Sequence, residues 1–176
     1  MNSEELKILG VSIHVVIPII TFFLGFFASR FTMTKKERKD YKAKLQENSN
    51  RLYEEHNQKY SNFAKALYTY ANKKEEPDIN DFFEISTKGD LYFNHVKSIC
   101  DSIISKNIDK NSMENTHLPF IKRVFEELLP QYYESLKTIA KKRNFQYKGE
   151  LKKENYLSIF EVYHKYIKPN TKNWPS

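Results

Sequence analysis

The sequence predicts an all-α protein in which one N-terminal transmembrane helix leads into a cytoplasmic bundle of helices. Three observations favour this class. The first thirty residues contain a long run without charged side chains, whereas 29% of the whole chain is charged. After that run, apolar side chains recur at helical spacing, and no stretch alternates with the period of a strand. The chain of 176 residues contains only four glycines, too few for the many tight turns of a typical sheet protein.

The N-terminal run has the length of a membrane span. Residues 8–29 contain no Lys, Arg, Asp or Glu, and as a helix they would extend about 33 Å, the thickness of a hydrocarbon core. A cleaved signal peptide would need a basic start and a shorter run, but the opening "MNSEELK" carries two acids. We therefore expect a retained transmembrane helix over 8–31, preceded by a short N-terminus over 1–7.

The charges on either side of the run predict its orientation. Only Lys7 is basic before the run, and the positive-inside rule therefore places residues 1–7 outside and the C-terminal domain in the cytoplasm. The single cysteine, Cys100, fits a reducing compartment and is expected to be a buried, inert thiol beside Ile99 and Ile103. The basic residues after the run are Arg30, Lys35, Lys36, Arg38, Lys39, Lys42 and Lys44.

Small and polar residues interrupt the apolar run mainly on one side, the exceptions elsewhere being Ser12 and some alanine. A spacing of three or four residues places them within about 100° of arc around a helix. In lipid, such residues gather where helices pack together or where a helix lines water. The stripe therefore indicates that the membrane helix associates with copies of itself, either as a close-packed dimer or bundle or as a ring around a central pore. Its members are Gly10, His14, Pro18, Thr21, Gly25 and Ser29.

The cytoplasmic bundle is expected over 32–168, followed by a loosely ordered tail over 169–176. Its basic neck, 35–44, is typical of a solvated segment next to a membrane that also touches anionic lipid, and RNA is a less specific alternative. The first helix is expected from about 34 to 72, before Pro77. Its apolar stripe consists of Tyr41, Leu45, Leu52, His56, Tyr60, Phe63, Leu67 and Ala71.

Three further helices are expected, over about 78–108, 118–143 and 151–167. Gly89 is expected to separate a short first piece from the main part of the first of these. Pro130 is expected to kink or split the second. The polar segment "DKNSMEN" between them is expected to be a loop.

The sequence contains one pair of residues that suits acid–base chemistry. Phosphate-loop, dinucleotide and zinc-protease signatures are absent, the five histidines have no metal-ligand spacing, and no cofactor or metal is expected. In "RLYEEH", however, Arg51 could hold a phosphate and His56 could move a proton, which are the two needs of RNA cleavage by a 2′-hydroxyl. The alternative is that His56 belongs to the core stripe, because five positions along a helix place the two side chains about 140° apart.

Arg, four residues and His is the minimal signature of the HEPN ribonucleases, which are small helical bundles. This sequence departs from the common form, because Leu52 follows the Arg where a polar residue is usual and the pair lies in an early helix. The departures leave cleavage activity open. With its N-terminal span, basic neck and HEPN-like bundle, the chain resembles in layout the Csx-type membrane accessory proteins of type VI-B CRISPR systems.

The resemblance covers most of the chain and implies a function. It implies a homo-oligomeric pore, an octamer being one possible form, in the lipid bilayer of a bacterial inner membrane. The pore would act with the RNA-guided RNase of the system to depolarise the infected cell and strengthen antiphage defence. The alternatives are a membrane-tethered HEPN ribonuclease that binds RNA and cleaves it with Arg51 and His56, and a non-enzymatic membrane-anchored adaptor.

Overall fold

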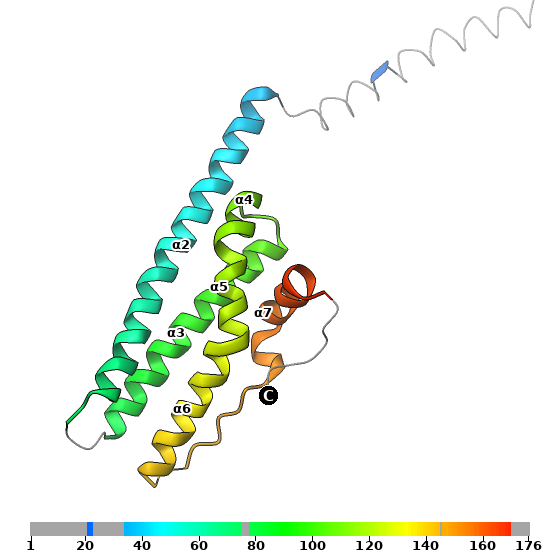
Figure 1. Ribbon diagram of the computed structural model, residues 1–176. Coiled ribbons are helices and arrows are strands. Elements are labelled where there is room, and N and C mark those ends of the chain that lie inside the picture. Colours follow the sequence, from blue (N-terminus) through cyan, green and yellow to red (C-terminus); the bar gives the residue numbers. More distant parts are fainter. Residues whose placement is uncertain (1–20, 23–33, 75–77, 145, 170–176) are drawn as a thin grey trace, which may run out of the picture. The chain divides into compact units, whose positions relative to one another are not determined.

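The computed structural model describes residues 21–22, 34–74, 78–144 and 146–169 (Figure 1). The chain divides into two compact units, 1–43 and 44–176. In the described residues all regular structure is helical and no strand occurs, which confirms the all-α prediction. No helix in this part of the chain combines the length and the apolar character that a membrane span requires. The predicted span over 8–31 lies outside the described residues, apart from Thr21 and Phe22.

Helix α2 (Lys35–Ala71) agrees with the long first helix expected from the sequence. It begins with a capping box at Thr34: the Thr34 hydroxyl accepts a hydrogen bond from the Glu37 backbone N–H at 3.2 Å, and the Glu37 carboxylate accepts one from the Thr34 N–H at 2.7 Å. The hydrogen bonds that the Thr34 N–H and hydroxyl donate to the Glu37 carboxylate lower the pKa of Glu37 below its usual value. The side chains that α2 buries are Ser49, Leu52, His56, Phe63 and Ala66. The predicted stripe is confirmed in its middle part, whereas Tyr41 and Ala71 at its ends are exposed.

Helix α3 (Ile79–Ile104) is continuous, so the interruption predicted at Gly89 is wrong. The helix starts at a second capping box, in which the Asp78 side chain accepts hydrogen bonds from the backbone of Asn80 and Asp81. Gly89 lies inside the helix, where only glycine avoids a collision, because a Cβ at this position would strike the ring of Tyr132. The glycine thus permits a close approach between helices and does not mark a break.

The next helical stretch is longer than expected, because "DKNSMEN" is helical from Lys110 onward and is not a loop. The Asp109 side chain caps its start by accepting a hydrogen bond from the Ser112 N–H at 2.9 Å. In chain order the stretch consists of α4 (Lys110–Ser112), the π-helical turn η1 (Met113–His117), α5 (Leu118–Arg123), the π-helical turn η2 (Val124–Leu128) and α6 (Leu129–Lys142).

The two π-helical turns allow this stretch to continue through two prolines. Proline lacks an N–H, and its ring clashes with a carbonyl one turn earlier in an α-helix. Here the residue before each proline, Leu118 or Leu129, donates its N–H to a carbonyl five residues back, and the wider turn accommodates Pro119 and Pro130. The helix therefore continues past Pro130 without a split, and the irregularity predicted at this proline takes the form of the π-helical turn η2.

The last helical region consists of the 3₁₀ turn η3 (Lys153–Tyr156), α7 (Leu157–Val162) and the π-helical turn η4 (Tyr163–Ile167), close to the predicted range. In Figure 1, α3 lies between α2 and α6, and α7 also packs against α3. The core is centred on α3, where Val96, Ile99 and Cys100 are fully buried. The full burial of Cys100 confirms the predicted buried thiol. This burial raises the pKa of the thiol well above its usual value.

Candidate functional site

The structure does not bring Arg51 and His56 together, although both lie on α2. The Arg51 guanidinium is exposed, forms an ion pair with the Glu55 carboxylate at 2.8 Å and donates to the Asn48 side-chain oxygen at 3.0 Å. His56 points the other way and is only 6% exposed. The angular separation expected from helical geometry is therefore present in the structure.

His56 packs as an aromatic core side chain. Its ring stacks on Phe120 with ring centroids 3.9 Å apart, and it also lies against Tyr60 and Tyr92. Its Nδ1 atom is buried without a hydrogen-bond partner. Burial, with a smaller contribution from two other histidines, lowers the pKa of His56 to about 4. The imidazole is therefore neutral at physiological pH and surrounded by rings.

Two further histidines lie close to His56 in the fold. His117 is fully buried, contacts the edge of Phe120, and has its pKa lowered to about 4, chiefly by burial. His95 on α3 donates from Nε2 to the Leu52 carbonyl oxygen at 3.0 Å, and its Nδ1 lies 3.5 Å from the Glu55 carboxylate. The sequence did not indicate this cluster, because its members lie far apart along the chain.

The chain of contacts from Arg51 through Glu55 to His95 joins the surface of α2 to α3. Both nitrogens of His95 face oxygen atoms of α2, so this side chain holds the two helices together. In the described part of the chain, no three His, Cys, Asp or Glu side chains are placed to hold a metal ion. What this region offers chemically is an exposed arginine in an ion pair with Glu55, together with the neutral, enclosed imidazoles of His56 and His117.

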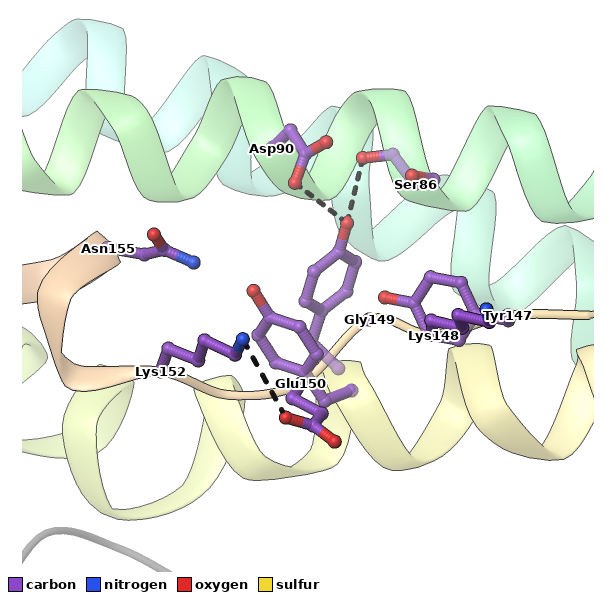
Figure 2. A pocket seen from close by; sticks show the side chains of 10 residues that line it. Ser86, Asp90, Tyr147, Lys148, Gly149, Glu150, Lys152 and Asn155 are labelled. Atoms are coloured by element: carbon purple, nitrogen blue, oxygen red, sulfur yellow. Dashed lines mark hydrogen bonds and ion pairs between the residues drawn. The ribbon is translucent and has the colours of Figure 1, made fainter.

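A polar pocket lies between α3, α6 and the segment 146–155 (Figure 2). Its volume is about 490 Å³. Figure 2 shows the side chains of Asp90, Tyr147, Lys152 and Asn155 directed toward the same space. The pocket is lined by Ser86, Asp90, Tyr132, Tyr133, Tyr147, Lys148, Gly149, Glu150, Lys152 and Asn155.

Tyrosine hydroxyl groups organise the walls of this pocket. The Tyr132 hydroxyl lies 3.0 Å from the Asp90 carboxylate and 2.9 Å from the Ser86 carbonyl oxygen, and it can donate to either. The hydroxyls of Tyr133 and Tyr156 are hydrogen-bonded to each other at 3.0 Å. Burial raises the pKa of Tyr147 to about 12, so its hydroxyl stays protonated at neutral pH.

The sequence did not predict the pocket. Its residues come from α3, from α6 and from the segment 147–155, which begins within a stretch, "NFQYKGE", that has the composition of an ordinary loop. Two local features of the sequence were the only signals of a polar pocket. They are the neighbouring tyrosines of α6 and the alternation of lysine with glutamate after Tyr147.

The residues of the predicted membrane stripe are not tested by the structure. Gly10, His14, Pro18, Gly25 and Ser29 lie outside the described residues. Thr21 is described, and it is exposed within a helical turn.

No protein-family model matches the chain, and searches of curated proteins and of solved structures returned no significant match.

Proposed function

We propose that this chain is a single-pass membrane protein that self-associates through residues 8–31 into a homo-oligomeric pore. The observation that carries the proposal is the one-sided stripe of small and polar residues within an apolar run of membrane-spanning length. A helix that met only lipid would gain nothing from such a stripe. Copies arranged in a ring would turn it toward their shared axis, where water and ions could pass.

The bundle supports a pore in preference to a ribonuclease. RNA cleavage by a 2′-hydroxyl needs a proton-transfer group and a cationic donor on the same phosphate. In the bundle, Arg51 faces outward and is paired with Glu55, while His56 is enclosed beside Phe120. We assign the bundle the role of a HEPN-like cytoplasmic domain that assembles the oligomer and receives its signal.

The proposed biological role follows from the resemblance in layout. The pore would sit in a bacterial inner membrane and act with the RNA-guided RNase of a type VI-B CRISPR system. Opening of the pore during phage infection would depolarise the cell and strengthen defence.

The first test measures assembly and conductance of the full-length protein. In mild detergent we expect a defined oligomer by light scattering, and in vesicles a conductance that His14→Leu and Thr21→Leu change. Phe23→Leu is the matched control, because helical periodicity places Phe23 on the side opposite the stripe. A strictly monomeric protein, or equal effects of all three variants, would contradict the proposal.

A second test distinguishes the pore from a ribonuclease and from an adaptor. A tethered ribonuclease would degrade RNA, and both Arg51→Ala and His56→Ala would abolish the degradation. We expect RNA to remain intact with the folded wild-type oligomer. An adaptor would keep its full protective effect in cells when the chain starts at Thr34, whereas a pore would lose it.

A further inference from the structure

We propose that the pocket between α3, α6 and the segment 146–155 is a binding site for a nucleoside phosphate whose base carries an exocyclic amino group. The proposal does not depend on the pore, since all of its residues belong to the bundle. It rests on polar side chains that face one pocket, several of which have no hydrogen-bond partner among the described residues.

Opposite charges line the pocket, and among the described residues only Lys152 and Glu150 of this lining form an ion pair with each other. Within the described residues, Asp90 forms no ion pair and its only hydrogen-bonding side-chain partner is Tyr132, while Lys148 has no acidic partner. The Tyr147 hydroxyl and the Asn155 amide likewise make no hydrogen bond in this part of the chain. A ligand that supplies both a donor and an anion could contact all four groups. Asp90, Lys148 and Asn155 are exposed, so such a ligand would replace water at these side chains.

Asp90 is held in position to accept a hydrogen bond from a base. Its Oδ1 atom lies 3.0 Å from the hydroxyl of Tyr132, whose ring is packed tightly over Gly89. This contact fixes the carboxylate and leaves Oδ2 available. A carboxylate oxygen is the acceptor that matches an exocyclic amino group of a base.

The opposite wall suits a phosphate. Lys148 and Lys152 are exposed ammonium groups on the pocket rim, and Lys152 lies 3.9 Å from Glu150, too far for a tight hydrogen-bonded pair. Lysine binds phosphate as a point charge. The protonated Tyr147 hydroxyl and the Asn155 amide add neutral donors or acceptors between the two charged ends.

The size and lining of the pocket favour a nucleotide over a smaller zwitterion. Its volume of about 490 Å³ falls in the usual range of ligand sites. The rings of Tyr133 and Tyr147 are partly exposed at the pocket and can stack on a planar base, whereas the Tyr132 ring is buried. A free nucleotide and one unit of an RNA strand share this chemistry.

The binding test uses the full-length protein in detergent and calorimetric titration with AMP, IMP, adenosine and a short oligoadenylate. We expect saturable binding of AMP, and binding weaker by about tenfold or more for IMP, which lacks the amino group, and for adenosine, which lacks the phosphate. Tighter binding of the oligoadenylate than of AMP would identify an RNA strand as the source, and equal or weaker binding a free nucleotide. Absence of AMP binding at millimolar concentration would overturn the proposal.

Two variants separate the roles of the two walls. Asp90→Asn should reduce the preference for AMP over IMP, whereas Lys148→Ala should reduce the preference for AMP over adenosine. Asp101→Asn and Lys106→Ala are the controls, since both side chains are exposed and lie outside the pocket. Equal weakening of all ligands by both pocket variants, with unchanged melting temperatures, would overturn the assignment of these contacts.

Discussion

His56 and His117 show how a titratable side chain can serve as an uncharged core residue. Each is nearly or fully buried, and neither Nδ1 atom has a hydrogen-bond partner. Aromatic rings cover both imidazoles, with Phe120 common to the two. Packing therefore contributes stability only while the rings remain neutral, and the free energy of unfolding becomes linked to pH.

We predict that the bundle loses stability as the pH falls from 6.5 toward 4. The unfolded histidines take up protons near 6.5, but burial lowers the folded pKa of both His56 and His117 to about 4. Protons therefore bind the unfolded state first, at a cost of roughly 2 kcal/mol per histidine at pH 5. Denaturant titrations between pH 7.5 and 4.5 measure this loss.

His117→Leu provides the control for this prediction. The variant should be nearly as stable as the wild type at pH 7.5, since it removes two unpartnered nitrogens from an apolar site. It should lose less stability than the wild type on acidification. An unchanged pH profile in this variant would show that other groups cause the acid sensitivity.

Arg51 and His56 should differ sharply in their effects on stability. Arg51→Ala breaks an exposed ion pair with Glu55 and should cost about 0.5 kcal/mol or less. His56→Ala removes a buried, stacked ring and should cost about 2–4 kcal/mol. Thermal unfolding of the two variants measures the difference, and equal costs would contradict the packing described for His56.

At the scale of elements, the contact between α3 and α6 depends on the absence of a side chain at position 89. A Cβ at Gly89 would collide with the ring of Tyr132. We therefore expect Gly89→Ala to destabilise the protein by about 1–3 kcal/mol, despite the higher helix propensity of alanine. Thr87→Ala, at an exposed position of the same helix, should have little effect.

A double-mutant cycle tests the cause. In a Tyr132→Ala background the collision is absent, and Gly89→Ala should then stabilise α3 by about 0.5–1 kcal/mol. The reversal of sign, measured by denaturant unfolding, is the expected result. Destabilisation of similar size in both backgrounds would assign the cost to some other contact.

Helices with a regular apolar stripe could be predicted from the sequence. The predicted ranges of α2 and of the last helical region were close to the observed ones, because the apolar side chains of both repeat every three or four residues. Pro77 bounds the first of these helices, and a polar loop bounds the second. The predictions failed at Gly89 and at "DKNSMEN", and of the kink or split predicted at Pro130 the split does not occur. At each of these places local residue preference favoured a break, but a close helix contact, a cap at Asp109 or a π-helical turn kept the helix intact.

At the scale of the whole molecule, the positive charge is unevenly distributed along the chain. The net charge is +7, and six basic residues lie between Lys35 and Lys44 against two acidic ones, whereas the residues before the apolar run carry one lysine and two acids. This asymmetry is the basis of the proposed orientation, with the bundle on the cytoplasmic side.

The orientation can be tested by moving the charge. In cells, the bundle of the wild type should resist protease added from outside. Replacing Lys35, Lys36 and Lys39 with glutamine and adding lysines before residue 8 should expose the bundle in a fraction of the molecules. The same number of glutamine substitutions at Lys141, Lys142 and Lys148 is the control and should leave the orientation unchanged.

The candidate sites were less predictable than the fold. Arg51 and His56 share a helix, so their angular separation followed from the sequence alone. The histidine cluster and the tyrosine pocket depend on contacts between residues more than twenty positions apart, such as Tyr132 with Asp90 and His95 with Leu52. No local spacing encodes such contacts, because they arise only when α2, α3 and α6 pack.

The π-helical turn η2 makes the pocket tolerant of one change in the length of the chain. Such a turn holds one residue more than an α-helix would need, and Tyr132 lies four residues after it. Loss of any one residue from 124–128 would restore α-helical pairing there without rotating α6 relative to α5, because the turn already absorbs the extra residue. Loss of one residue from 129–131, which are regular α-helix, would instead turn the tyrosine by about 100° away from Gly89, so homologues that keep this pocket should carry any single-residue gap within 124–128.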